Sequence, residues 1–503
     1  MSSELIWDTT KNFISYPKQI KNVYKKIYCD NYKNFNLLIN DLSKNNYKDF
    51  NWWLNILASR DERLSSIFHY ICILKSLNKL TRLKKRINLI VKSRALKKII
   101  DNKNLKNFRV KVINENFLLQ TIKLMREFFI FVFAITVAKI INNHEIDKHK
   151  DLNLIDMFDI NQKNQKKLYF GKYFKKIDLK FLYVPTFLSY SPKQIFKNFK
   201  NDKIVIKEKY VKFKDIFFIL KNLLFKKFYL NKNIKNDYKD LFYEEINSLG
   251  NLRSVMISYI NFIFFKNLSE KGIKIKKVIS WHENQIIDKG WSLGLKYFYP
   301  ESDYIGYQGS TLHPQFFNLS PTKYEYLAGA IPKKVVLVGK KYKNNREQFF
   351  KGIKFEYEKN NRFNFNLKCK KKTILFLLTG IKQVDQILLN LSDKCSKEFK
   401  NVKIKFHPIC PSKNFGKKYK NEITGNASKI ICSSNIVITS SYTSGLYESM
   451  GFNSKSVLVE FTPLDEKLFN DLSKYTNQIE FCKDELKLKK ILRYLMKKPI
   501  LIN

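Results

Sequence analysis

The chain has 503 residues, of which 44% are hydrophobic and 15% aromatic. A chain of this length exceeds one ordinary hydrophobic core, so we expect two domains with an appendage, and its apolar content argues against global disorder. The formal net charge is +50, from 94 lysines and arginines against 44 aspartates and glutamates. Such a charge attracts anionic partners, namely nucleic acid, anionic lipid or an anionic polymer.

Two explanations of this charge stay open, compositional drift and function. Lysine, asparagine and isoleucine are all abundant, as in a genome that has drifted toward A and T, and drift is the favoured explanation. The lysines are spread along the whole chain and lack the arginine-rich clustering of nucleic-acid readers. We therefore expect no nucleic-acid partner, whereas contact with the anionic inner membrane remains a prediction.

The cysteines and the N-terminal residues indicate a cytoplasmic protein. Seven scattered cysteines without a CxxC pair are typical of reduced thiols, and the first residues lack the pattern of a signal peptide. Residues 118–141 are apolar, but their uncharged core runs only from Phe128 to Ala138. This is about half of the roughly 20 residues that a membrane span requires. We expect a buried helix there, with insertion into a membrane surface as the alternative.

The chain order of apolar runs predicts three segments. Residues 1–80 carry no strand-like run, which predicts an N-terminal helical subdomain. In residues 81–330 short apolar runs alternate with helical segments, a pattern typical of a parallel sheet with crossover helices. The strands expected in this segment are 86–93, 109–113, 179–185, 204–206, 278–281 and 304–308.

Residues 311–332 contain three prolines and are expected to cross to a second unit of the same kind, residues 331–503. Its expected strands are 333–339, 373–380, 403–406, 436–439 and 456–461, and residues 341–371 are expected to be irregular. The predicted fold class is therefore α/β, with two Rossmann-like domains that face each other across a cleft. The first would hold an acceptor and the second a donor nucleotide, because strand ends in open parallel sheets bind such ligands.

The most informative motif is a His-Pro pair at the end of an expected strand. Residues 403–406 alternate polar and apolar side chains and are followed by His407 and Pro408. A histidine at a strand end can donate to, or form an ion pair with, a departing phosphate, and fixed donors of this kind stabilise such leaving groups. The alternative is an ordinary surface turn.

A second motif strengthens the first. The apolar run 436–438 leads into a hydroxyl-rich turn that opens a helix, with Ser440, Ser441, Thr443, Ser444, Gly445 and Glu448 as its polar and glycine residues. Hydroxyls and backbone N–H groups at a helix start favour an anion, and Glu448 is placed to accept from ribose hydroxyls. Simple helix capping is the alternative. The two motifs together predict a nucleotide-sugar site.

The N-terminal half offers a candidate general base. The expected strand 278–281 ends at His282 and Glu283, and Glu283 is our candidate to take the proton of an acceptor hydroxyl. His282 could serve instead or orient the acceptor, and Glu283 could simply cap the next helix. Gln308, at the next strand end, would face the same cleft. We expect no metal, since a solvated loop is favoured over a metal site for His144, Asp147 and His149.

At these residues the chain resembles a family of bacterial surface-carbohydrate biosynthesis proteins (capsule and O-antigen). More distantly it resembles capsule transferases of the glycosyltransferase B (GT-B) class, including polysialyltransferases and Kdo transferases. The matching stretches are residues 281–285, 306–308, 320–325, Pro332, 406–408 and 440–448, with weaker similarity at Trp52, Trp53, Arg60 and 154–158.

The resemblance implies that His407, Pro408, Ser440 and Ser441 hold the nucleotide of a CMP-sugar. The family's base motif is an acidic pair followed by glycine, whereas His282, Glu283 and Asn284 stand here. The expected function is a metal-independent, inverting glycosyltransferase without a cofactor, acting on a glycan or lipid-linked acceptor. The alternatives are a polyol-phosphate transferase of the teichoic-acid type and a non-catalytic basic scaffold for anionic polymer or nucleic acid.

Overall fold

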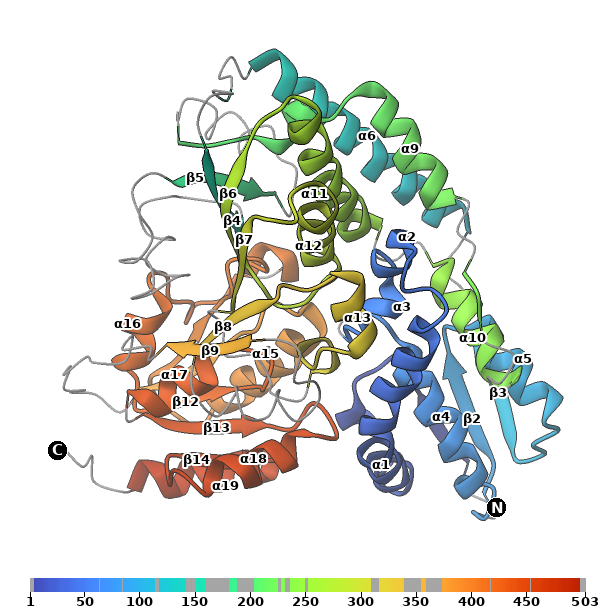
Figure 1. Cartoon of the computed structure of the whole chain (residues 1–503). Helices are drawn as coiled ribbons and strands as arrows, with labels where there is room; N and C mark the ends of the chain where they lie inside the picture. The colour runs from blue at the N-terminus through green and yellow to red at the C-terminus, as the bar shows by residue number, and fades with distance from the viewer. Residues whose placement is uncertain are drawn as a thin grey trace.

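The computed structural model describes most of the chain, with gaps in loops and at both ends. The described residues are 4–62, 64–83, 85–113, 117–141, 146, 151–158, 181–187, 203–224, 228–230, 236–248, 252–308, 316–338, 354–358, 373–416, 418–452 and 454–497. Three sheets organise this part of the chain, and every strand pair in them is parallel (Figure 1).

The first sheet belongs to an N-terminal α/β unit and has the order β1-β2-β3. Its strands and main helices are β1 (Leu5–Asp8), α1 (Lys18–Ser43), α2 (Phe50–Trp53), α3 (Ile56–Ser59), α4 (Ile67–Leu80), β2 (Ile87–Val91), α5 (Arg94–Asn102) and β3 (Phe108–Val112). Buried aromatic side chains from this unit, with Trp7, Trp52 and Trp53 among the largest, form the centre of its core.

The prediction of a purely helical segment 1–80 is wrong, because β1 lies within it and pairs with β2. The strands expected at 86–93 and 109–113 form, but they complete this small sheet instead of joining the Rossmann-like sheet of residues 81–330. The physical reason is that β1 is only four residues long and finds its partner about 80 residues later. Such a short run carries no periodic signal.

The second sheet has six strands in the order β5-β4-β6-β7-β8-β9. Its elements are α6 (Phe117–Ile141), β4 (Leu152–Phe158), β5 (Phe181–Thr186), η3 (Lys207–Tyr210), α9 (Phe213–Leu224), α10 (Asn236–Ile246), α11 (Leu252–Glu270), β6 (Ile275–Trp281), α12 (Ile286–Phe298), β7 (Asp303–Gln308), η4 (Phe317–Leu319), α13 (Lys323–Ala328), β8 (Lys334–Val338) and β9 (Lys354–Glu358).

Two details of this sheet correct the sequence predictions. The strand β8 pairs with β7 and β9 with β8, so residues 334–338 and 354–358 belong to the N-terminal sheet and not to the expected second domain 331–503. An apolar run predicts a strand but not the sheet that it joins. Residues 204–206 form no strand, since Ile204 makes only an isolated bridge to Tyr183.

The third sheet has five strands in the order β11-β10-β12-β13-β14. Its elements are β10 (Ile374–Leu377), α15 (Lys382–Ser396), β11 (Val402–Lys405), η5 (Ser412–Phe415), α16 (Ala427–Cys432), β12 (Ile436–Thr439), α17 (Gly445–Gly451), β13 (Lys455–Val459), α18 (Asp465–Ser473), β14 (Ile479–Cys482) and α19 (Glu485–Lys497). The α/β fold class and the two Rossmann-like sheets are therefore confirmed, with a third, small sheet added.

Strand order locates the places where each large sheet can bind a ligand. When the strands of each sheet are numbered in chain order, so that β4 and β10 are each strand 1, the spatial order is 2-1-3-4-5-6 in the second sheet and 2-1-3-4-5 in the third. In doubly wound sheets of this kind ligands bind beyond the carboxyl ends of strands 1 and 3, where the winding reverses. These positions are the ends of β4 and β6 in one sheet and of β10 and β12 in the other.

Helix α1 of the N-terminal unit contacts the C-terminal sheet (Figure 1). Lys21 and Lys25 donate to the carboxylate of Glu460, which directly follows β13, at 2.7 and 2.8 Å, and Lys25 also reaches Glu466 at 2.6 Å. Because Glu460 is only 1% exposed, these ion pairs are shielded better than ordinary surface pairs. They tie α1 to the edge of the sheet where β13 ends.

Candidate active site

His407 follows β11 and lies beside the end of β10. Its ring Nδ1 accepts from the backbone N–H of Ile409 at 3.3 Å, so a neutral ring carries its proton on Nε2 and can donate there. Burial, and in second place the charge of Lys405, lowers the pKa of His407, which favours this neutral form. Pro408 lies in the turn in which Cys410 N–H donates to the His407 carbonyl at 3.0 Å.

Gly380, just after β10, allows the close approach of the chain to this imidazole. Its φ is +89°, and a Cβ at this position would lie 2.8 Å from His407 Nδ1. A side chain would therefore be strained by the backbone conformation and would also push the ring away. The loop after β10 thus fixes one side of His407.

The hydroxyl-rich turn after β12 lies on the other side of β10. Because β10 separates β11 from β12, His407 and this turn are roughly two strand spacings, about 10 Å, apart. Gly445 packs against β10, since a Cβ there would come within 2.0 Å of Leu377 Cδ2. The structure thus brings the two predicted motifs to opposite sides of one strand end.

The hydroxyls of this turn divide into buried and accessible ones. Ser440 and Ser441 are buried; Ser440 Oγ accepts from the N–H of Tyr442 at 3.2 Å and so shapes the turn. Thr443 and Ser444 are half-buried, and Thr443 Oγ1 accepts from Gly445 N–H at 3.2 Å. A ligand can therefore reach Thr443 and Ser444 more directly than the buried pair.

Helix α17 contributes less to anion binding than its sequence suggests. It spans seven residues, so little dipole accumulates and the attraction of an anion rests on the hydroxyls of the turn. Glu448, the expected ribose acceptor, accepts from Ser428 Oγ at 3.0 Å and from Ser444 Oγ at 3.2 Å. It is half-buried and joins α17 to α16 at the rim of the turn.

Sequence reasoning missed Asp465, which organises this turn from outside it. Its carboxyl group accepts from Ser441 Oγ at 2.5 Å and from the N–H groups of Phe461 and Thr462 at 2.6 and 2.7 Å. Burial raises the pKa of Asp465 to about 6, against the opposing effect of these hydrogen bonds. The sequence signal for Asp465 was the pair Asp465 and Glu466 at the start of a helix. Such a pair is equally consistent with simple helix capping.

Glu283 lies after β6, next to the winding reversal of the six-stranded sheet. Its carboxylate accepts from Trp281 Nε1 at 3.1 Å and from Gln285 Nε2 at 2.7 Å. Two donors therefore hold a half-buried carboxylate at the strand end where a ligand is expected. The capping box of the next helix is formed by Gln285 and Asp288 instead, and Asp288 Oδ2 accepts from the N–H groups of Glu283 and Gln285 at 2.9 Å.

His282 and Gln308 are more deeply placed than Glu283. His282 is 5% and Gln308 2% exposed, and the His282 N–H donates to the Tyr307 carbonyl at 2.9 Å, which extends the β6–β7 pairing. His282 packs against Gly306, where a Cβ would lie 3.0 Å from its own Cβ. His282 thus supports the strand end, whereas Glu283 is the more accessible of the two.

The short helix η4 connects the two half-sites. Asn318 Nδ2 donates to the Glu283 carbonyl at 2.7 Å, while Phe316, two residues earlier, stacks on Tyr442 with ring centroids 5.8 Å apart. Tyr442 lies in the turn between Ser441 and Thr443. The loop after β6 and the turn after β12 therefore meet through η4 and its N-cap residue Phe316, although Glu283 and Tyr442 lie far apart in the sequence.

A buried charge cluster fixes the Glu283 loop to the N-terminal unit. Glu325 accepts from Arg60 Nη2 at 2.6 Å and from Lys289 Nζ at 2.5 Å, and all three side chains are 0% exposed. Asn284, with φ of 55°, donates to Glu325 at 3.2 Å. Despite burial, the two cations lower the pKa of Glu325 to about 2. The weak similarity at Arg60 thus marks a structural contact.

A second buried cluster lies at the β4 side of the same reversal. Thr186 Oγ1 donates to Asp156 Oδ1 at 2.8 Å, and Lys207 Nζ donates to Thr186 Oγ1 at 2.8 Å and Asn261 Oδ1 at 2.6 Å. Burial raises the pKa of Asp156 to about 6, although Lys207 opposes this. All four side chains are buried, so the cluster supports the strand ends from within.

We expect a pH-dependent stability from Asp288. Burial raises its pKa to about 8, so the stability that it contributes is complete below pH about 4 and is lost as the pH rises to about 8. The free energy of unfolding should fall by at most about 1.4 kcal/mol per pH unit from this group. Asp288→Asn should remove that component, as urea unfolding at several pH values would measure.

The matched control is Asp303→Asn, an exposed carboxyl group on β7 that pairs with Lys277. Its curve of unfolding free energy against pH should run parallel to that of the wild type. Equal pH dependence of Asp288→Asn and wild type would show that Asp288 is ionised in the folded protein.

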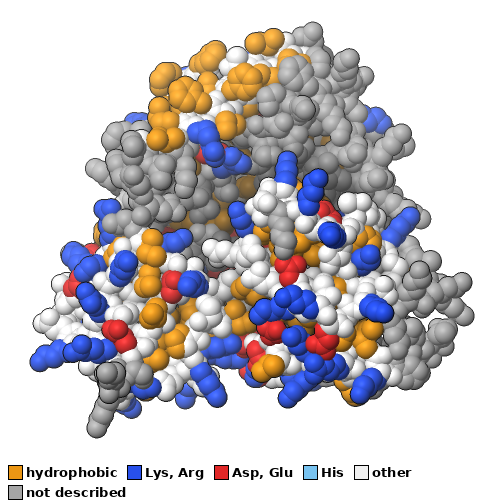
Figure 2. Space-filling view, turned by 180° about the vertical axis from the view of Figure 1, so that it is seen from behind, with side chains coloured by type: hydrophobic (Ala, Val, Ile, Leu, Met, Phe, Trp, Pro, Cys, Tyr) orange, Lys and Arg blue, Asp and Glu red, His pale blue; other side chains and the backbone are white. Residues whose placement is uncertain are grey.

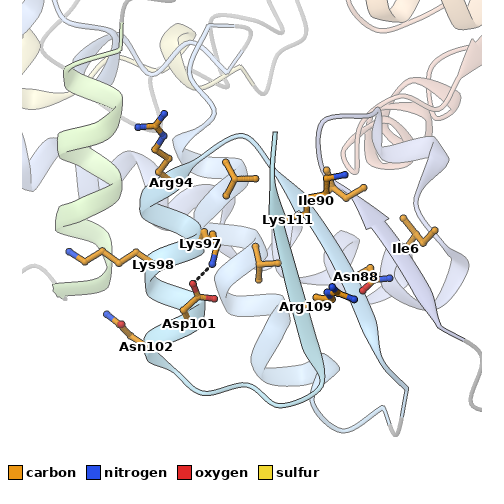
Figure 3. Close-up of a pocket in the computed structure, with 12 residues that line it drawn as sticks. Ile6, Asn88, Ile90, Arg94, Lys97, Lys98, Asp101, Asn102, Arg109 and Lys111 are labelled. Atoms are coloured by element: carbon orange, nitrogen blue, oxygen red, sulfur yellow. Dashed lines mark hydrogen bonds and ion pairs between the residues drawn. The ribbon is translucent and has the colours of Figure 1, made fainter. Parts of the chain in front are cut away.

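Among the described residues no group of three or more His, Cys, Asp or Glu side chains could hold a metal ion. His144, Asp147 and His149 lie outside the described part of the chain. A groove of about 1010 Å³ lies away from the candidate site, along α5 and the edge of β3 (Figure 3). Arg94, Lys98, Arg109 and Lys111 are among the residues that line it (Figure 3), and none of the predicted site residues does.

The comparisons with known proteins leave the site as the main evidence. No protein-family model and no curated protein sequence matches the chain. Among solved structures, the glycotransferase of kitacinnamycin superposes with a TM-score of 0.38 at 6% identity, covering 70% of this chain and 92% of that one. MurG of Acinetobacter baumannii gives a TM-score of 0.37 at 8% identity, covering 69% and 91%. At such values the likeness carries no argument for fold or activity.

Proposed function

We propose that this chain is a glycosyltransferase of bacterial surface-polysaccharide synthesis that uses a nucleotide-sugar, CMP-linked by preference. One observation carries the proposal. Two doubly wound sheets each present chemistry-bearing residues at or beside the reversal of winding. Asn318 of η4 and Phe316, the N-cap residue of η4, join these two strand ends. A two-substrate transfer needs such a pair of neighbouring sites, one for the donor and one for the acceptor.

In this proposal the donor phosphate binds between His407 and the turn after β12. His407 Nε2, which carries the proton in the neutral ring, donates to a phosphate oxygen, and the hydroxyl of Thr443, which accepts from Gly445 N–H, donates its own proton beside it. The Ser444 hydroxyl joins them by turning its proton from Glu448 to the phosphate. Ser440 and Ser441 shape the turn, and a hydroxyl that accepts one hydrogen bond can still donate its own proton. Glu448 at the rim is available to ribose hydroxyls.

Glu283 acts as the general base on the acceptor side. As an acceptor hydroxyl attacks the anomeric carbon, the carboxylate takes its proton, and the bond to the phosphate breaks with the electron pair leaving on the phosphate oxygen. Direct attack inverts the anomeric centre. The fixed donors of the C-terminal sheet stabilise the charge on the leaving group, and the proposed acceptor is a glycan or a lipid-linked sugar.

Product analysis tests this assignment. The wild-type protein, incubated with CMP-sialic acid or CMP-Kdo and short surface-glycan oligosaccharides, should release CMP and add the sugar without phosphate. With CDP-glycerol, no glycerol phosphate should be transferred. Transfer of the polyol together with its phosphate would establish the teichoic-acid-type reaction instead. A folded protein that turns over none of these donors would favour the non-catalytic scaffold.

A further inference from the structure

The exposed phenylalanines of this protein gather on one surface. Within the described ranges, five phenylalanines are exposed, and all five lie on α6 or α9: Phe129, Phe133, Phe213, Phe217 and Phe218. Ile122, Met125 and Ile140 of α6 are exposed as well. Figure 2 shows hydrophobic side chains gathered at the top of the molecule, where Figure 1 places α6 and α9.

The spacing of these residues shows that each helix has two apolar faces. On α6, Met125, Phe129 and Phe133 recur every four residues and form one outer stripe, while Phe131 and Ile135 are buried in the core. On α9, Phe213 and Phe217 point outward and Ile216 and Ile219 inward. The prediction of a buried helix at 118–141 therefore holds for one face of α6 only.

The two exposed stripes lie on helices that meet at one end. Lys139 of α6 places its Nζ 4.3 Å from the ring centroid of Phe213 at the start of α9, and the two helices lie side by side (Figure 1). Exposed large apolar side chains gathered in one region in this way are rare on a monomeric soluble protein and mark a place of contact with a partner.

The charges on the two helices identify the partner. Arg126, Lys214 and Lys221 are exposed cations, whereas the acidic residues Glu127 and Asp215 are 14% and 3% exposed. Glu127 is paired with arginines, and Asp215 accepts from Asn267 Nδ2 at 2.7 Å. The surface therefore presents aromatic rings and positive charges outward without an exposed carboxylate among its described residues.

We propose that the outer face of α6 and α9 is a docking surface for an anionic lipid membrane. Aromatic and aliphatic side chains enter the interface between headgroups and acyl chains, and the surrounding cations bind anionic headgroups. No helix of the described chain is long and apolar enough to cross a bilayer, so the helices lie along the surface.

A second copy of the chain fits this face poorly. The cations of one copy would meet those of the other, with no exposed carboxylate on the described part of either helix to pair with them. The net charge of +50 adds a general repulsion between copies. The same charges favour an anionic bilayer, because each cation near such a surface strengthens binding about fivefold.

Vesicle sedimentation tests the proposal without reference to the reaction. The full chain should sediment with vesicles of phosphatidylglycerol and phosphatidylcholine and only weakly with phosphatidylcholine alone. The triple variant Phe129→Ser, Phe133→Ser, Phe217→Ser should bind the anionic vesicles at least about tenfold more weakly. Lys214→Glu with Lys221→Glu should reduce binding to anionic vesicles and leave binding to neutral ones unchanged.

The control variant is Tyr475→Ser with Leu486→Ser, two side chains that are each 73% exposed on the C-terminal unit. It should bind vesicles like the wild type. The proposal is overturned if the wild-type protein does not bind anionic vesicles, or if the triple variant binds them as strongly as the wild type. Self-association in sedimentation velocity that the triple variant abolishes, without vesicle binding, would assign the face to a second copy of the chain.

Discussion

Glu283→Gln should lower kcat by about 10²- to 10⁴-fold, the usual contribution of a general base. Trp281 and Gln285 donate to different oxygens of Glu283, so the single amide oxygen of glutamine keeps one of these two hydrogen bonds. The loop should keep its conformation, because the N–H groups of Glu283 and Gln285 still donate to Asp288. The KM for the nucleotide-sugar should change little, because the proposed donor site lies on the other sheet. Steady-state kinetics with the preferred donor measure both constants.

The matched control for this substitution is Glu301→Gln, an exposed carboxyl group beyond the end of α12. It should leave kcat and the melting temperature unchanged. A Glu283→Gln variant with wild-type kcat would exclude Glu283 as the base and would move the role to the neighbouring His282.

His407→Ala should lower kcat by about 10²- to 10³-fold, which is the cost of removing one fixed donor from a developing anion. Unlike Glu283→Gln, it should also weaken nucleotide binding, because in the proposed site the imidazole donates to the phosphate already in the bound state. The side chain is half-buried and its ring meets only the Gly380 loop and the Ile409 N–H among the contacts described above. The fold should therefore survive.

Two further variants separate chemistry from structure at this position. His407→Gln keeps an N–H donor and should recover part of the lost activity. Lys403→Ala removes an exposed side chain from the same strand and should behave like the wild type. Equal losses in His407→Gln and His407→Ala, together with a lowered melting temperature in both, would indicate that His407 only supports the turn.

Most strands of the two large sheets were predictable because their signals are local. The strands β4, β9 and β14 were not predicted, and β9 lies within residues 341–371, which were expected to be irregular. Alternating and apolar runs identified β6, β7 and β10 to β13, and each is followed by a helix or turn whose residues could be read in place. The assignment of strands to sheets was not predictable. β8 joins β7 rather than the C-terminal unit, because pairing depends on partners far along the chain.

The same distinction between local and long-range signals explains which parts of the candidate site could be predicted. The positions of Glu283, His407 and the turn from Ser440 at strand ends were predictable, because a strand followed by polar residues is a local pattern; their roles are part of the proposal. The side chains that hold them were missed, since Arg60 and Glu325 are separated by 265 residues and Ser441 and Asp465 by 24. The burial of Ser440 and Ser441 could not be predicted either. The sequence of a hydroxyl-rich turn is the same whether its hydroxyls bind a ligand or are covered by the protein.

The central claim is a nucleotide site at the ends of β10, β11 and β12, and calorimetric titration tests it most directly. CMP, UDP, GDP and CDP-glycerol are titrated into wild-type protein and into His407→Ala. We predict micromolar binding of CMP by the wild type, its loss in the variant at an unchanged melting temperature, and no comparable binding of the other three. A folded wild-type protein that binds none of the four nucleotides would contradict the account.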